Sequence, residues 1–555
     1  MRRREFITAT AGAAIGLMLG RPRSATSSAR PQRKPNVLFI MTDQQHAGMM
    51  SCTGNKWLNT PAMDRLAASG VRFERAYVCN PAWWHGHPGR EPRAASPCHR
   101  FSLQTGLMPS AIGMAENSDS GRATVTDAML QQSLGRLFQK AGYETVYGGK
   151  VHLPRNINDV QEIGYRKLTA DARQGLADAC ATFIKGQHTR PFLLFASFIN
   201  PHDICYMAIN DFRRASGEVP VDNIDSRTCE AVLARAREAG DISAFVEKNC
   251  PPLPANVARP SWPCFHGLEA HATVPDAEPE CITQKYITAA PFLLCEAALP
   301  TPPKQPLRLR RPDRCEERVR AHVRQNWTQD QWRLHRWAYC RLTEVVDREI
   351  GTVLDALREA GLEDNTLIVL TSDHGDMDSA HRMEHKSVLY EESVRVPFIM
   401  SYRGMIPTGI VDDTHLVSNG LDLLPTLCDY AGIEIPEGLP GRSLRPLAAA
   451  KDGTAWRDFV VCESQNGRML RTDRFKYCIY DSGRGREQLT DLEHDAGEMR
   501  NLAEVRDYKD VLDTHRELLR GWVGKTVDRI AAEYLDPPDV RRIDVKWIRQ
   551  AHHKP

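Results

Sequence analysis

Four short apolar segments of the sequence end in side chains that can bind metals, anions or protons. The segments are residues 36–42, 145–147, 191–199 and 366–372, and they lead into Asp43, into Lys150 and His152, into His202, and into Asp373 and His374. Carboxylates beside an imidazole are suited to holding a cation. Lysine and histidine side chains are suited to holding a tetrahedral oxyanion and to stabilising charge in a transition state.

These segments predict a particular kind of scaffold. Continuous apolar runs of this length are typical of strands buried on both faces, as in parallel sheets. Helical patterns lie between them, one beginning at Pro61 after Thr60, and a long one over residues 332–360 that stops at Gly361. Strands that alternate with helices indicate an α/β doubly wound sheet. Ligands of such sheets bind outside the carboxyl ends of the strands, so we expect the four polar ends to converge on one site.

Asp43, Asp373 and His374 are the predicted centre of a metal site. Unpaired carboxylates at the ends of buried strands are costly, and a bound cation would offset that cost. Oxygen-rich ligands favour a hard cation, calcium or magnesium, over zinc. One such aspartate alone would more simply be a helix N-cap, but four polar strand ends together favour a site.

A second set of side chains predicts a cationic ring around an anionic substrate. His385 could add a proton donor to this ring, although a structural role stays open for both His381 and His385. The ring consists of Lys150, His152, His202 and Lys386.

The segment from Ser96 to Gly106 resembles the signature of the sulfatase family. That signature has Cys or Ser, any residue, Pro, any residue, Arg and, after four more residues, Thr-Gly. Arg100 and the pair Thr105-Gly106 match it, which places Ser96 at the nucleophile position. With Ser96 as the nucleophile the signature proline would be expected at position 98, but position 98 is Cys and the proline is at 97. The register of the match is therefore open by one or two residues, and Cys98 is a second candidate for the nucleophile.

Further motifs resemble the same family in the same order, and together they cover most of the mature chain. They are residues 36–45 (first metal motif), 59–77 (the helix after it), 149–152 (G-K-x-H), 372–375 (second metal motif), 386–393 (the substrate-lysine helix) and 492–503 (the C-terminal signature).

The resemblance implies an alkaline-phosphatase-like fold, mostly parallel, with a smaller C-terminal antiparallel-sheet domain. It implies that a formylglycine-generating enzyme oxidises residue 96 to formylglycine, whose hydrate attacks sulfur. Calcium, with magnesium or manganese as alternatives, would be ligated by Asp43, Gln44, residue 96, Asp373 and His374. Gln44 stands where a second Asp is commoner and keeps an oxygen ligand. Arg100 and Lys150 would hold the formylglycine diol, and His152, His202 and Lys386 would grip sulfate, with His385 as a further substrate contact.

The chain organisation predicts three parts. Residues 34–440 would form the catalytic domain, with irregular insertions at 82–95 and 250–315, and residues 441–555 a C-terminal α+β subdomain, since short apolar segments separated by turns follow residue 458. Residues 1–29 combine an arginine cluster, a weakly apolar stretch and small residues. They predict an export signal of the twin-arginine type, and so a periplasmic or extracellular protein; a disordered basic leader is the alternative.

Composition excludes some classes of partner. The 72 basic and 70 acidic side chains leave a net charge of +2, which gives no reason to expect nucleic acid. No apolar run reaches the roughly 20 residues that a spanning helix needs. The 15 cysteines are an odd number, and the sequence favours mostly buried or free thiols.

The function predicted from these features is sulfate-ester hydrolysis, with sulfated polysaccharide as the expected substrate class. Two alternatives stay open. One is a phosphonate or phosphodiester hydrolase on the same scaffold, because such substrates are also tetrahedral. The other is a non-catalytic protein that binds sulfate without turnover.

Overall fold

The computed structural model describes residues 33–81, 97–113, 125–257 and 326–535, apart from positions 155, 156, 158, 452, 465, 466 and 482–484, and also residues 319, 322 and 323. The predicted signal at residues 1–29, the insertion at 82–95 and residues 258–315 of the second insertion lie outside this part.

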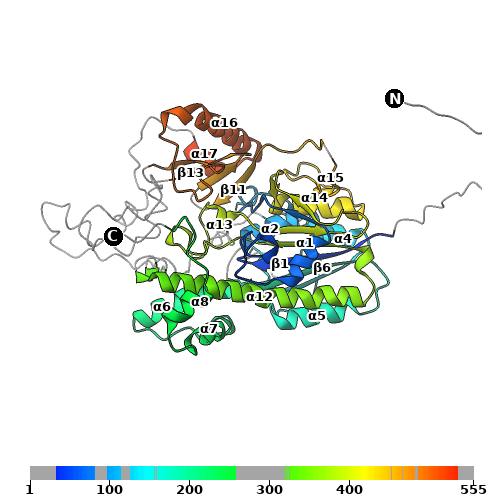
Figure 1. Cartoon of the computed structure of the whole chain (residues 1–555). Helices are drawn as coiled ribbons and strands as arrows, with labels where there is room; N and C mark the ends of the chain where they lie inside the picture. Colours follow the sequence, from blue (N-terminus) through cyan, green and yellow to red (C-terminus); the bar gives the residue numbers. More distant parts are fainter. Residues whose placement is uncertain are drawn as a thin grey trace, which may run out of the picture. The chain divides into compact units, whose positions relative to one another are not determined.

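A mixed eight-stranded sheet forms the core of the described chain (Figure 1). Its central strands are parallel, whereas β8 is antiparallel to both of its neighbours. In spatial order the strands are β5 (Arg166–Lys167), β4 (Glu144–Gly149), β6 (Phe192–Pro201), β1 (Asn36–Asp43), β7 (Thr366–Ser372), β8 (Phe398–Ser401), β2 (Val71–Phe73) and β9 (Ile410–Asp412).

The strand register brings the polar ends together. On β1, Met41 is opposite Ser197 of β6 and Thr371 of β7, and Gly149 of β4 is also opposite Ser197. Four parallel strands therefore end at one edge of the sheet, so the prediction that their polar ends converge is confirmed for the backbone.

Helices cover both faces of the sheet because successive residues of each strand point to opposite sides. On β1, Leu38 and Ile40 pack in one apolar cluster with α1 (Pro61–Ala68), α5 (Gln174–Ile184) and α12 (Gln329–Glu359). Phe39 and Met41 pack in another cluster with α2 (Pro97–Thr105), α4 (Leu134–Lys140), α14 (Asn419–Ala431) and α15 (Arg445–Ala448). The doubly wound architecture predicted from the sequence is confirmed.

A smaller antiparallel sheet follows in the C-terminal part, as predicted. Its strands are β11 (Val460–Ser464), β12 (Gly467–Arg471), β13 (Phe475–Tyr480) and β14 (Glu487–Asp491), and α16 (Lys509–Thr526) and α17 (Arg529–Leu535) share an apolar cluster with it.

The remaining elements are short or lie beside α12. Three helices, α6 (Cys205–Ala215), α7 (Ile224–Arg237) and α8 (Ile242–Asn249), lie along the N-terminal half of α12 (Figure 1). The others are β3 (Ala76–Tyr77), β10 (Val417–Ser418), α3 (Asp127–Gln131), α13 (Glu391–Val394) and the 3-10 helices Ser51–Thr53, Pro109–Ile112, His202–Ile204, Glu363–Asn365, Ala380–Arg382 and Arg506–Tyr508.

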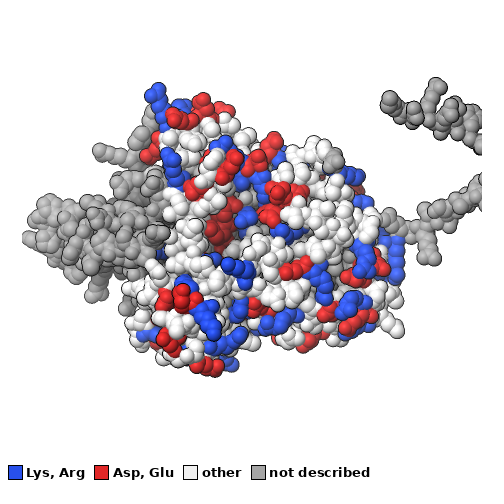
Figure 2. Space-filling model, in the orientation of Figure 1, with Lys and Arg blue, Asp and Glu red and all other residues white. Residues whose placement is uncertain are grey.

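The described surface and thiols agree with the composition. Basic and acidic side chains are interspersed over the face in view (Figure 2). Within the described ranges, ten cysteines are free, and all of them except Cys52 are buried. None of the described helices is both long enough and apolar enough to span a membrane.

Candidate active site

Three buried groups form a candidate metal centre at the carboxyl ends of β1 and β7. The Nε2 atom of His374 lies 3.8 Å from Oδ1 of Asp43 and 3.6 Å from Oδ1 of Asp373, and all three side chains are fully buried. Since Nδ1 of His374 lies 2.9 Å from the carbonyl of Gly375, it donates there, and Nε2 keeps its lone pair. Neither Nε2 of His374 nor Oδ1 of Asp43 has a hydrogen-bond partner. These orphaned acceptors fit a cation.

The other carboxylate oxygens of the same two aspartates are held by Arg100, from α2. Its Nη2 donates to Oδ2 of Asp43 at 2.7 Å and its Nε to Oδ2 of Asp373 at 3.0 Å. Its Nη1 donates to the hydroxyl of Ser197 at 2.5 Å and to the carbonyl of Lys150 at 3.1 Å. Each aspartate is thus divided, with one oxygen on the guanidinium and the other beside His374.

Burial and nearby charges shift the pKa values of Asp43 and Asp373 in opposite directions. Burial and the charge of Asp43 raise the pKa of Asp373 to about 6. Burial would also raise the pKa of Asp43, but the charges of Lys150, Arg100 and Lys386 outweigh it and hold that pKa well below its usual range. A cation would complete the ionisation of the pair, since metal ligands must be deprotonated.

Lys150 reaches the same cluster because of the glycine before it. Gly149 has a φ of +90°, and a Cβ there would lie 2.1 Å from the carbonyl oxygen of Ser197. The chain can therefore turn tightly after β4, with the Lys150 amide donating to Ser197 at 2.8 Å. The Lys150 ammonium then contacts Oδ2 of Asp43. Burial lowers the pKa of Lys150, and the charge of Asp43 opposes this shift.

The charges of this cluster shift the pKa values of His152 and His202. Burial, followed by the charges of Lys150 and Arg100, lowers the pKa of His152 well below its usual value. Burial and the charges of Lys150 and Lys386 do the same to the pKa of His202. Both rings are therefore neutral near pH 7, and Nδ1 of each lacks a hydrogen-bond partner.

Gln44 links the metal centre to Lys386. Its Oε1 accepts from Nζ of Lys386 at 2.9 Å, and its Nε2 donates to Oδ2 of Asp376 at 2.7 Å. Gln44 has a φ of +67°, and its backbone is fixed by bonds to Asp373 and Tyr339. The amide oxygen expected from the resemblance to be a metal ligand thus faces the ammonium of Lys386.

Sequence reasoning missed two members of this cluster, Ser197 and Asp376. Ser197 lies inside an apolar strand, and only the sheet register reveals its position. Asp376 follows Gly375 directly, so its proximity to the second metal motif was the available signal.

The remaining predicted residues are the two nucleophile candidates and two histidines. Ser96 and the side chain of Cys98 lie outside the described part. The ring of His385 lies against the carboxylate of Glu384, and the ring of His381 stacks on Tyr390 with ring centroids 4.1 Å apart.

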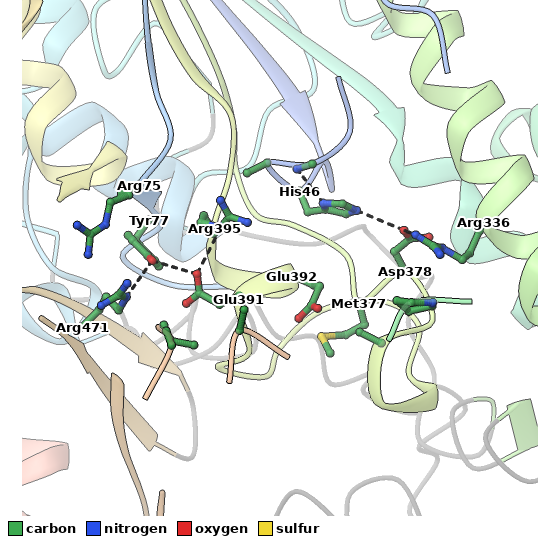
Figure 3. A pocket seen from close by; sticks show the side chains of 16 residues that line it. His46, Arg75, Tyr77, Arg336, Met377, Asp378, Glu391, Glu392, Arg395 and Arg471 are labelled. Atoms are coloured by element: carbon green, nitrogen blue, oxygen red, sulfur yellow. Dashed lines mark hydrogen bonds and ion pairs between the residues drawn. The ribbon is translucent and has the colours of Figure 1, made fainter. Parts of the chain in front are cut away.

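A cavity of about 370 Å³ opens beside the segment that follows the metal centre. Figure 3 shows Asp378 turned toward His46 and Arg336 at one side of it. Arg336 donates to Oδ2 of Asp378 at 3.0 Å, and Nε2 of His46 lies 3.5 Å from the same oxygen. Glu391, at the other side, is held by Tyr77 and Arg395. Asp378 therefore has partners different from those of its near neighbour Asp376.

The mixed sheet, the carboxylates at the ends of its parallel strands and the cations around them fit the alkaline-phosphatase-like fold, with a candidate metal centre. The family model for "Sulfatase" matches residues 35–88 and 96–433, and the model "N-sulphoglucosamine sulphohydrolase, C-terminal" matches residues 379–522. The chain belongs to the sulfatase family, whose members are hydrolases of sulfuric esters.

Individual relatives agree with this assignment. A Delta 4,5-hexuronate-2-O-sulfatase of Bacteroides thetaiotaomicron is 27% identical over 525 residues, covering 90% of this chain and 91% of that protein. An N-acetylglucosamine-6-O-sulfatase of the same organism is 25% identical over 537 residues, covering 87% and 86%. The solved structure of a 2-O GAG sulfatase has the same fold, with a TM-score of 0.65 and 24% identity over 94% of this chain and 97% of that one.

Proposed function

We propose that the protein is an exported sulfatase that removes sulfate esters from saccharides, using a formylglycine made from Ser96 or Cys98 and a bound calcium ion. The observation that carries the proposal is that Asp43 and Asp373 each have one carboxylate oxygen bound to Arg100 and the other beside His374. This arrangement leaves a buried acceptor set for a hard cation beside Arg100 of α2, a residue of the sulfatase signature. The saccharide substrate rests on the printed activities of the two relatives.

In this proposal Asp43, Asp373 and His374 hold the cation, with Gln44 and residue 96 as further candidate ligands. The cation would supply positive charge at the nucleophile and the sulfate oxygens. Arg100 and Lys150 hold the nucleophilic residue in place.

Lys386, His152 and His202 would bind the sulfate group and the leaving oxygen. Both imidazoles are neutral without substrate, because burial and nearby cations lower the pKa of each. A sulfate anion brought beside them would raise both pKa values, since an opposite charge favours the protonated form. Substrate binding would therefore prepare a proton donor for the leaving alkoxide.

Peptide mass spectrometry across Ser96 to Arg100, on protein from its native host, tests the nucleophile. A mass lower by about 2 Da at Ser96, or by about 18 Da at Cys98, would identify the residue converted to the aldehyde. An unmodified peptide would contradict the formylglycine mechanism and favour a sulfate-binding protein without turnover.

Parallel assays test the substrate class. One enzyme preparation would be assayed with four substrates: an aryl sulfate, a phosphodiester, and a monosaccharide and an oligosaccharide that each carry a sulfate ester. We expect turnover of the sulfates and the highest kcat/KM with a saccharide. Higher kcat/KM with the phosphodiester would contradict the proposal.

Export and domain organisation are part of the same proposal. Residues 1–29 would be removed as a twin-arginine signal, and residues 34–440 and 441–555 would form the catalytic domain and the C-terminal subdomain. The N-terminal sequence of the secreted or periplasmic protein tests the signal, and a mature chain that still begins at Met1 would contradict it.

A further inference from the structure

Asp376 lies immediately beyond the candidate metal centre, and its carboxylate accepts three hydrogen bonds. Oδ1 accepts from the backbone amide of Asp378 at 2.7 Å. Oδ2 accepts from Nε2 of Gln44 at 2.7 Å and from the backbone amide of His385 at 3.0 Å. The side chain is fully buried, so no solvent can replace these donors.

This carboxylate determines which way the amide of Gln44 faces. The two ends of a glutamine amide have the same shape, and only the chemistry of their partners distinguishes them. Both oxygens of Asp376 already accept from backbone amides, those of Asp378 and His385, and the ammonium of Lys386 can only donate. The one orientation that satisfies both directs Nε2 to Asp376 and Oε1 to Lys386, whose ammonium lies 2.9 Å away. The thiol of Cys205 tolerates either orientation, because it lies 3.2 Å from Nε2 and 3.3 Å from Oε1.

The same carboxylate also anchors the backbone that carries Lys386. Asp376 binds the amide of His385, the residue just before Lys386, so a closed ring runs from Asp376 through Gln44 and Lys386 back to Asp376.

The segment between Asp376 and His385 has several residues in the left-handed backbone conformation, which is unfavourable for residues other than glycine. Left-handed backbone of this kind persists only where the surroundings impose it. The residues of this segment with positive φ are Asp378, Ser379, His381, Arg382 and His385.

We infer that Asp376 is a positioning residue that fixes the ammonium of Lys386 in the sulfate site, through the amide of Gln44 and the backbone of His385. The inference deepens the proposed function, because it rests on the role proposed for Lys386.

The test is a double-mutant cycle with Asp376→Ala, Lys386→Ala and the double variant. Inorganic sulfate is the first probe, with its affinity measured by thermal shift, and kcat/KM for an aryl sulfate is the second. Asp376→Ala should weaken sulfate affinity and kcat/KM by about tenfold to a hundredfold, the range expected for lost hydrogen bonds to a charged group. In the Lys386→Ala background the same change should alter either quantity by no more than about twofold.

Two variants separate positioning from general damage to the loop. Asp378→Asn removes a negative charge of the same loop that faces Arg336 and His46 rather than Gln44 or Lys386, and asparagine tolerates the positive φ at this position. It should leave sulfate affinity close to that of the parent. In Asp376→Asn the single oxygen can still accept from Gln44 and His385, whereas the amide nitrogen would face the backbone amide of Asp378 and lose that bond, so this variant should recover part of the affinity.

Two results would overturn the inference: additive effects of Asp376→Ala and Lys386→Ala, or an equal loss in Asp378→Asn. Sulfate affinity reports on the ring even if no ester is turned over. A parent protein that binds sulfate without hydrolysis would contradict the proposed function alone.

Discussion

Replacing Arg100 by methionine should make the stability of the protein depend strongly on the bound cation. The change keeps an apolar side chain of similar length but removes four hydrogen bonds and the charge that compensates Asp43 and Asp373. Breaking a buried charge network by removing one partner costs about 3–5 kcal/mol. Without a cation, Lys150 would be the positive charge left in contact with Asp43.

A bound divalent cation should reduce this loss, because it neutralises the same carboxylates from their other side. Saturating a site at about 100 times its Kd adds about 2.7 kcal/mol of stability. Thermal unfolding of parent and Arg100→Met, each with excess calcium and with EDTA, measures both effects. We expect the melting temperature of the variant to fall further below that of the parent in EDTA than in calcium, and we expect no sulfatase activity in either condition.

The C-terminal sheet supplies a matched control for this experiment. Arg468 is also fully buried and bound to a carboxylate, with Nε 2.6 Å from Oδ2 of Asp528, but these residues lie in β12 and just before α17. Arg468→Met should lower the melting temperature by the same amount with and without calcium. An equal loss for Arg100→Met in the two conditions would refute the reasoning that Arg100 and the cation share the two aspartates.

Three further changes test other parts of the structure. His335 is fully buried, and burial lowers its pKa from 6.5 to about 4. As the pH falls from 6.5 to 4 the unfolded chain is protonated at this histidine before the folded chain, so the parent should lose about 3 kcal/mol of stability. His335→Phe should abolish this loss, as measured by the free energy of unfolding across pH. A parallel pH dependence in variant and parent would contradict this cause. Gly149→Ala should displace Lys150, because its Cβ would lie 2.1 Å from the carbonyl oxygen of Ser197; we expect kcat/KM to fall at least about tenfold, and normal kinetics would show that the turn is not required. Lys476→Met removes the cation that β13 inserts between two glutamates near α13; it should cost about 3–5 kcal/mol in the free energy of unfolding, and an unchanged melting temperature would contradict that estimate.

The sheet was predictable because its central strands are long and apolar on both faces. The strand predicted over residues 366–372 is the one observed. The helix predicted over residues 332–360 begins three residues earlier, because Thr328 and Gln331 form a capping box at its N-terminus. The antiparallel β8 and the short β2 gave no such signal, since they contain four and three residues.

The strand pattern alone predicted the candidate site where a polar residue ends or directly follows a strand, whereas Arg100 and Lys386 were predicted from motifs. Asp43, Lys150 and Asp373 meet that condition, and the cluster contains all three. Ser197 does not, because its hydroxyl reaches Arg100 only through the pairing of β6 with β1 and β4. The orientation of Gln44 was equally hidden, since it depends on a positive φ and on partners more than 300 residues away.

The charges in this cluster explain how so many ionisable groups can share one buried site. Three aspartates, Asp43, Asp373 and Asp376, face three cations, Arg100, Lys150 and Lys386, and every one of the six is buried. Burial raises the pKa of Asp376 to about 7. With all six groups ionised the three positive and three negative charges balance, so that a divalent cation would leave a net charge of +2. A singly charged sulfate ester and an ionised nucleophile together carry −2 and would restore neutrality. An aspartate at position 44 would lower the net charge of the cluster by one unit and would place a second carboxylate, which can only accept, against the carboxylate of Asp376. The neutral amide of Gln44 avoids both penalties and still carries the link from Asp376 to Lys386.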